Sequence, residues 1–222
     1  MNTAFITMAM RCWYCRCYKE INLGMQMTRW LLSVSLLVGS VAFGQTPDTI
    51  TVTHKYYSST FDRTKHYPVV VKYWLTKKMY SCTTKIKRTN KFTPDPAIPA
   101  VTNLKSDYAG PGYDRGHNMP AEDNTCSAVG MKECFYYSNM TPQTHSLNAG
   151  VWKTLEIYAR KQAKTYDSVI VWCGSVSLSS NTIGQVSVPD CSWKIVYVKK
   201  LEQRKRIHSE TICCLHNYGW AG

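Results

Sequence analysis

The sequence predicts one globular domain of mixed α+β class, and three observations lead to this class. First, 222 residues are enough for a sizeable core, and 44% hydrophobic with 18% charged residues is typical of globular proteins. Second, segments rich in β-branched and aromatic residues predict strands at 50–54, 67–75, 168–174 and 192–200. Third, residues 148–166 have helical spacing without a helix-breaking residue.

The first 44 residues resemble a targeting segment more than a folded one. Arg29, an apolar run of about 14 residues and the small residues Ala42 and Gly44 predict an export signal at 25–44. The run is shorter than the roughly 20 residues of a membrane span, which favours a cleaved signal over a retained anchor. We expect residues 1–24 to be an over-extended gene start. The mature protein is then periplasmic or secreted, without stable membrane association.

Cysteine usage also indicates an oxidising compartment. The chain has ten cysteines, more than an ordinary cytosolic enzyme carries. Seven of them follow the predicted signal, so at least one must be free or paired with another molecule. None of these seven forms a Cys-x-x-Cys pair, which argues against a structural zinc site.

The charge balance points to a polyanionic partner. The formal net charge is +13, and removal of residues 1–44 leaves 23 basic and 13 acidic residues. Such a surplus favours nucleic acid, because lysine and arginine on phosphates release condensed counterions. Basic residues concentrate in 77–91 and interleave with Tyr80 and Phe92, as in a groove that follows a phosphate backbone. A solvated strand face is the alternative.

Three further segments complete the predicted organisation. Proline and glycine make residues 93–112 a long loop that leads to Asp114. In the predicted helix, one face carries Val151, Leu155, Tyr158 and Gln162, and the following strand is expected to end at Gly174. Residues 45–200 would form the functional domain. Residues 201–222 do not fit a core element, and we interpret them as an atypical tail, frameshifted or truncated.

A cluster of chemistry-bearing residues lies between positions 113 and 156. His117 is a candidate general base, because imidazole titrates in the required range. Arg115 offers a permanent cation with a fork that matches phosphate, and Gly116 permits close approach. A histidine beside an arginine is more often structural, but the residues that follow favour the catalytic interpretation.

Asn148 and Glu156 are the candidate metal-site residues. The amide oxygen of Asn148 is a hard, neutral donor of the kind that Mg²⁺ accepts, although Asn148 could instead cap the following helix. Glu156, eight residues further on, lies near the same helix face and could accept hydrogen bonds from water around the metal. The alternative for Glu156 is an exposed helix glutamate.

Together these motifs resemble a known family. Asp114-Arg-Gly-His117, Asn139-Met-Thr-Pro-Gln143 and Leu147-Asn148 with Trp152 and Glu156 are similar to the sugar-non-specific DNA/RNA endonucleases with a ββα-metal (His-Me finger) core. The resemblance covers roughly residues 60–200. It implies an α+β fold on a central, mainly antiparallel sheet. The finger would consist of a strand at 114–117, a second strand at 135–139 and a helix from about 148.

The resemblance also implies roles for individual residues. His117 would be the general base, Arg115 would stabilise the phosphate, Asn139 would assist near the base, and Glu156 would hold water at the metal. Asn148 would be the direct ligand of one Mg²⁺, with Mn²⁺ as a substitute. We expect further substrate contacts from Asp114, Gln143, Lys85, Lys87 and Arg88. The substrates would be DNA and RNA, and the products would carry 5′-phosphates.

Two function classes remain for this sequence: a nuclease and a nucleic-acid-binding module without activity. Other enzyme classes lack support, because the sequence has no Gly-x-Ser-x-Gly elbow, no His-Glu-x-x-His and no phosphate-binding glycine loop. The rival is a catalytically inactive basic module that binds nucleic acid. The joint presence of His117, Asn148 and Glu156 favours the enzyme.

Overall fold

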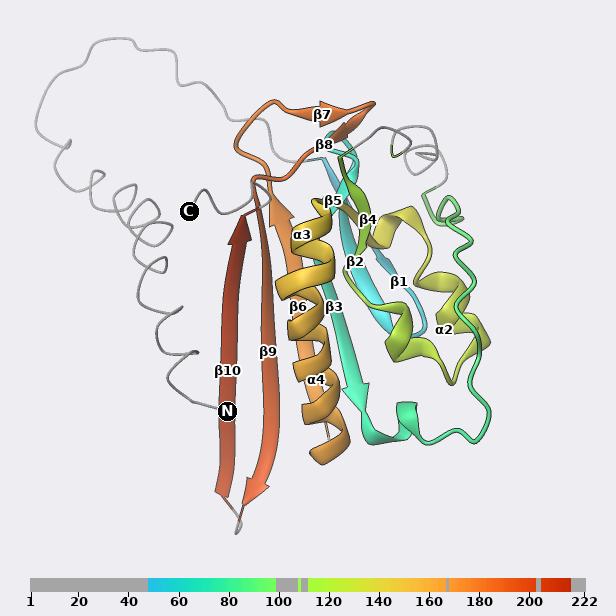
Figure 1. The fold of residues 1–222 in the computed structure, drawn as a ribbon, viewed down its shortest axis with the longest axis vertical. Helices are drawn as coiled ribbons and strands as arrows, with labels where there is room; N and C mark the ends of the chain where they lie inside the picture. The colour runs from blue at the N-terminus through green and yellow to red at the C-terminus, as the bar shows by residue number, and fades with distance from the viewer. Residues whose placement is uncertain (1–47, 99–107, 109–111, 167, 203–204, 217–222) are drawn as a thin grey trace, which may run out of the picture. The chain divides into compact units, whose positions relative to one another are not determined.

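A six-stranded, fully antiparallel sheet forms the centre of the computed structural model (Figure 1). The structure describes residues 48–98, 108, 112–166, 168–202 and 205–216, and from residue 199 onward it describes the backbone alone. The predicted over-extended start at 1–24 and the export signal at 25–44 lie outside the described residues. No helix in the described ranges is long and apolar enough to cross a membrane.

The strands run in the order β1-β2-β3-β6-β9-β10. Their bounds are β1 Thr49–Thr53, β2 Tyr57–Asp62, β3 Tyr67–Thr76, β6 Ser168–Val176, β9 Cys191–Glu202 and β10 Lys205–His216. A small hairpin, β7 (Thr182–Ile183) and β8 (Val186–Ser187), lies between β6 and β9. The mixed α+β class with a mainly antiparallel sheet is confirmed.

Two expectations about the sheet need revision. Gly174 does not end the strand, because β6 continues to Val176 and Gly174 pairs with Trp193 of β9. We expected no core element from residue 201 onward. The backbone of 205–216 nevertheless pairs with β9 along its whole length and forms an edge strand. The sheet therefore extends beyond the predicted domain boundary at residue 200.

The helix that covers this sheet begins earlier than predicted. It starts with α3 (His145–Leu147), continues through a π-helical turn at Asn148–Trp152 and becomes α4 (Lys153–Thr165). Thr144 is the N-cap, since its hydroxyl accepts a hydrogen bond from the Leu147 amide. The interpretation of Asn148 as the cap is therefore wrong.

The π turn also changes which residues of the helix are buried. Trp152, Leu155, Ala159 and Ala163 face the core, whereas Val151, expected on the buried face, is 46% exposed. Bonds of the i→i+5 type rotate the following residues away from the positions that a regular α-helical repeat predicts. The buried face packs on β3, β6 and β9 around Val71, Val171 and Val196 (Figure 1).

The chain between β3 and β6 is a long insertion that carries the predicted site. It contains η1 (Lys77–Tyr80), β4 (Asp114–His117), η4 (Ala121–Asn124), α2 (Ala128–Glu133), η5 (Tyr137–Asn139), β5 (Met140–Gln143) and then the helix. β4 pairs antiparallel with β5, so that Asp114 lies opposite Gln143 and His117 opposite Met140.

The first strand and the helix of the ββα core are thus confirmed, but the second strand is not at 135–139. Tyr137–Asn139 forms a 3-10 turn, and the strand is the four residues after it. Phe135 and Tyr137 are fully buried. The resemblance implied a strand here, but these aromatic side chains fill the core from turns.

A disulfide links Cys82, after η1, to Cys126, between η4 and α2. Cys134 and Cys173 are free and buried. This agrees with the expectation that the cysteines include both disulfides and at least one unpaired thiol.

Gly174 gives a direct test of the sheet geometry. A Cβ at this position would meet the Val69 carbonyl oxygen at 2.0 Å, and a backbone atom cannot swing away. We predict that Gly174→Ala lowers the free energy of unfolding by about 2–3 kcal/mol. Denaturant unfolding is the measurement. Val176→Ala, on the same strand where the side chain is 42% exposed, is the control and should cost about 1 kcal/mol or less.

Candidate active site

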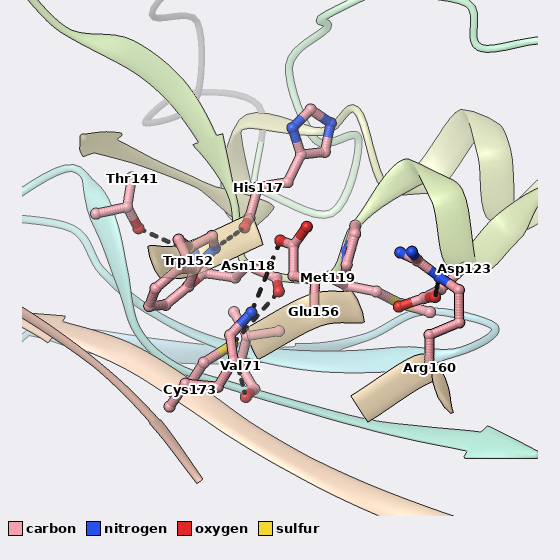
Figure 2. A network of polar contacts seen from close by, with 12 residues as sticks. Val71, His117, Asn118, Met119, Asp123, Thr141, Trp152, Glu156, Arg160 and Cys173 are labelled. Carbon is pink, nitrogen blue, oxygen red and sulfur yellow. Dashed lines mark hydrogen bonds and ion pairs between the residues drawn. The ribbon is translucent and has the colours of Figure 1, made fainter. Parts of the chain in front are cut away.

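His117 lies at the end of β4, under a cover of aromatic rings. It is 7% exposed. The Phe135 ring meets the imidazole edge-on with centroids 4.8 Å apart, and the Phe92 ring lies 5.7 Å away. The Trp152 indole donates a hydrogen bond of 2.9 Å to the His117 carbonyl oxygen (Figure 2). The backbone of His117 is thereby fixed to the helix as well as to β5.

The surroundings keep this imidazole neutral. Burial lowers the pKa of His117 to about 3, and the positive charges of Arg88 and Arg115 act in the same direction, against a hydrogen bond to the Arg115 backbone. The Nε2 atom has no hydrogen-bond partner within the described residues. A neutral imidazole with an unused ring nitrogen can accept a proton from water.

Two guanidinium groups flank the imidazole. The Cζ atom of Arg115 lies 4.3 Å from the centroid of Phe92, and that of Arg88 lies 5.1 Å from the centroid of Phe135. The same two rings contact His117, so the aromatic pair brings both cations to the base. The arrangement offers a positively charged surface beside a proton acceptor.

The basic segment that carries Arg88 is irregular. Residues 81–92 form neither helix nor strand, so the strand in the alternative interpretation is wrong, although the basic side chains of this segment are solvent-exposed as that interpretation expected. The predicted substrate residues Lys85, Lys87 and Arg88 are all exposed on this segment. Arg88 differs from the two lysines because it contacts the rings around His117.

Asn148 and Asp114 meet at the start of β4, at the opposite end of the strand from His117. The Asn148 amide nitrogen donates a hydrogen bond of 2.9 Å to Asp114 Oδ2, and His145 Nδ1 lies 2.9 Å from the same oxygen. Asp114, predicted to bind substrate, therefore contacts Asn148 and His145. His145 was not identified from the sequence. Its position, one residue after the Thr144 cap, offered no signal.

These contacts suit a hard, hydrated metal ion. Because the amide nitrogen of Asn148 faces Asp114, the amide oxygen is the atom that remains for a metal. No group of three or more His, Cys, Asp or Glu side chains in the part of the chain with described side chains could form a metal cage. One neutral oxygen donor with few other protein ligands fits Mg²⁺ or Mn²⁺, which keep most of their waters, rather than tetrahedral zinc.

Asn139 and Gln143 lie deeper than the sequence suggested. The Asn139 amide donates to the carbonyls of Met119 and Cys134 at 2.9 and 2.8 Å and accepts from the Met119 amide at 2.9 Å. It therefore holds the turn after His117. Gln143 is fully buried against Gly116, where a Cβ would meet its Oε1 at 2.3 Å. Gly116 makes room for this side chain.

Glu156 lies in a buried polar cluster with Lys194, Asp123 and Arg160. Burial raises the pKa of Glu156 to about 7, against the opposing charge of Lys194, whose Nζ lies 3.7 Å from Glu156 Oε1. In Figure 2 the carboxylate lies between Trp152 on one side and the Asp123–Arg160 pair on the other. With a side-chain exposure of 13%, it is not the solvent-exposed glutamate of the alternative interpretation.

Three members of this cluster were missed from the sequence. Asp123 accepts hydrogen bonds from Arg160 Nε at 2.7 Å and from the Tyr80 hydroxyl at 2.9 Å. Arg160 could have been found, because it follows Glu156 by one helical turn. Lys194 could have been found from strand alternation, since it has the same parity as the buried Val196 and Val198.

A separate hollow of about 430 Å³ lies beside the disulfide and includes Met79, Cys82, Asp123 and Cys126 in its lining. None of the predicted catalytic or metal residues lines it. The site around His117 is therefore distinct from this hollow.

Comparison with known proteins gives a consistent result. The sequence model of the DNA/RNA non-specific endonuclease family matches residues 37–219. The mitochondrial nuclease EXOG of Xenopus laevis is 37% identical over 124 residues, and a nuclease of Nostoc sp. is 32% identical over 174 residues. These alignments cover 50% and 75% of this chain. The chain spans only 35% of the EXOG length and 62% of the Nostoc nuclease.

A solved structure extends the comparison to the fold. The structure of the EndoG/EndoGI complex, described as showing the mechanism of EndoG inhibition, superimposes with a TM-score of 0.68 at 28% identity. The match covers 76% of this chain and 74% of the other.

The environment of His117 makes a spectroscopic prediction. Between pH 8 and about 5 the imidazole should stay neutral, because its pKa lies near 3. Nitrogen chemical shifts of His117, assigned with a His117→Ala variant, are the measurement. Protonation of His117 near pH 6.5 would show that burial and the two arginines do not act on it as described.

Proposed function

Because the chain belongs to the DNA/RNA non-specific endonuclease family, we propose that it hydrolyses phosphodiester bonds of DNA and RNA without sequence preference. One observation carries the proposal. A buried, neutral imidazole with an unpaired Nε2 lies beside two guanidinium groups. The unprotonated nitrogen can accept a proton and the fixed positive charge can stabilise a phosphate, while a pKa near 3 makes this imidazole a weaker base than one with the usual value of 6.5.

In the proposed mechanism His117 removes a proton from the attacking water. Arg115 and Arg88 offset negative charge on the phosphate, and their contacts with Phe92 and Phe135 limit how far they can move away. The hydrogen bond from Trp152 keeps the His117 backbone in place as the proton is taken up. Attack by water with departure of the 3′ oxygen gives 5′-phosphate and 3′-hydroxyl products.

The proposal includes a divalent cation, Mg²⁺ or Mn²⁺. When bound, such an ion supplies Lewis-acid stabilisation of the phosphate and of the departing oxygen. Asn148 would hold it through the amide oxygen. Asp114 orients that amide through its 2.9 Å hydrogen bond, and Glu156 would accept hydrogen bonds from nearby water.

We also propose that the protein is exported to the periplasm or secreted, through a signal at 25–44, with the functional domain beginning near residue 45. The Cys82–Cys126 disulfide supports this proposal, because such bonds persist in oxidising compartments.

Digestion of plasmid DNA and of RNA tests the proposed function. We predict that protein from residue 45 onward cuts both substrates with Mg²⁺ and not with EDTA. His117→Ala should lower the rate by about 10²–10⁴-fold, because the base is lost, while nucleic-acid binding stays largely intact. Equal loss of cutting and binding in this variant would refute the assignment of His117. Binding without any cutting by the folded native protein would instead support the inactive binding module.

The basic segment gives a second prediction with a matched control. Arg88→Ala should slow cleavage by about 10- to 100-fold, because a cation fixed beside the base is removed. Lys85→Ala removes the same charge from an equally exposed position three residues away that lacks the contact with the Phe135 ring, and should change the rate by about threefold or less. Initial rates at one fixed salt concentration are the measurement. Equal effects would mean that only overall charge matters.

A further inference from the structure

Lys194 is a buried cation in an otherwise apolar face of the sheet. On β9 the side chains of Lys194, Val196 and Val198 point to the same side, and all three are at most 1% exposed. The surrounding core consists of residues such as Val71, Val169 and Val171. Burying an ammonium group costs several kcal/mol unless it is compensated. A lysine at this position therefore requires a specific partner.

The partners are two residues of the active-site helix. Lys194 Nζ lies 3.7 Å from Glu156 Oε1 and 4.0 Å from the centroid of the Trp152 ring. Within the described residues the ammonium forms no hydrogen bond and no other ion pair. Trp152 is the residue whose indole binds the His117 carbonyl. One side chain thus contacts both the carboxylate and the ring that supports the base.

Of the other charged groups near Glu156, Arg160 also favours its ionised form, but only Lys194 lies within ion-pair distance in the described structure. Asp123, on η4, carries the same charge as Glu156 and opposes its ionisation. Arg160, on α4, directs its Nε to Asp123. Tyr73 on β3 and Cys173 on β6 also face the carboxylate, and burial raises the pKa of each above its usual value, so both are uncharged at neutral pH. Lys194 is the one cation in the described structure that forms an ion pair with Glu156.

We propose that Lys194 is a positioning residue, which holds the Glu156 carboxylate in place, favours its ionised form and supports the indole that binds the His117 backbone. The proposal rests on the proposed nuclease function for its catalytic consequence. The ion pair itself can be tested without any metal or substrate.

The first test is a titration of the metal-free protein. Carbon chemical shifts of the Glu156 carboxyl, assigned with Glu156→Gln, give its pKa directly. Lys194→Met should raise this pKa by about one unit or more, because an opposite charge within 4 Å favours the ionised form. Val196→Ala removes buried volume from the same face without removing a charge, and should leave the pKa unchanged. An unaltered Glu156 pKa in Lys194→Met overturns the proposal.

The second test measures cleavage as a function of pH. Lys194→Met should lower kcat with little change in KM and move the acid limb of the rate profile to higher pH. Lys194→Arg, which keeps the charge, should keep the profile of the native protein. In a Glu156→Gln background, Lys194→Met should have a smaller effect than in the native background, because only its contact with the Trp152 ring is then lost. Independent, multiplicative losses from the two substitutions would overturn the assignment.

The third test measures the yield of folded protein for the variants. If Lys194→Met lowers the yield of folded protein, addition of Glu156→Gln should restore it, because no unpaired buried carboxylate remains. A double variant as unstable as the single one contradicts the pairing. A native protein that cuts no nucleic acid refutes the proposed function alone, because the carboxyl titration still decides the role of Lys194.

Discussion

The hydrogen bond from the Trp152 indole to the His117 carbonyl joins the two halves of the site. β4 belongs to a two-stranded ladder, and the helix belongs to the core on the large sheet. Trp152 is fully buried in that core and is the residue at which the π turn passes into α4. Its indole N–H would cost free energy if it were buried without an acceptor. The need to satisfy this donor therefore sets the distance between the β4–β5 ladder and the helix.

The π turn serves the same requirement. It lies between Asn148 and Trp152, so the residue that contacts Asp114 and the residue that contacts His117 are separated by a widened turn. Such turns are energetically unfavourable in isolation and often occur at functional positions. Here it allows two side chains of one helix to reach opposite ends of the same short strand.

Much of the fold and of the candidate site could be predicted, because the information is local. The helix and four of the sheet strands follow from spacing and composition over a few residues, and the Asp-Arg-Gly-His strand follows from its motif. The errors arise where tertiary packing overrides local preference. Phe135 and Tyr137 fill the core from a turn and from a 3-10 turn rather than from a strand. Gly174 lies within a strand, where its pairing with Trp193 continues the ladder and a neighbouring carbonyl leaves no room for a larger residue. Lys194 escaped attention because its chemical type alone indicates a surface position.

The order of the strands has a consequence for how the chain folds. β3 and β6 are neighbours, yet the whole insertion separates them, and Tyr73 pairs with Val171. Closing so large a loop is entropically expensive and slow compared with forming the local hairpins β2–β3 and β9–β10. Until that closure, the apolar edges of two partial sheets remain open to other chains. The topology that carries the insertion in the middle of the sheet thus makes assembly of this domain sensitive to protein concentration and temperature.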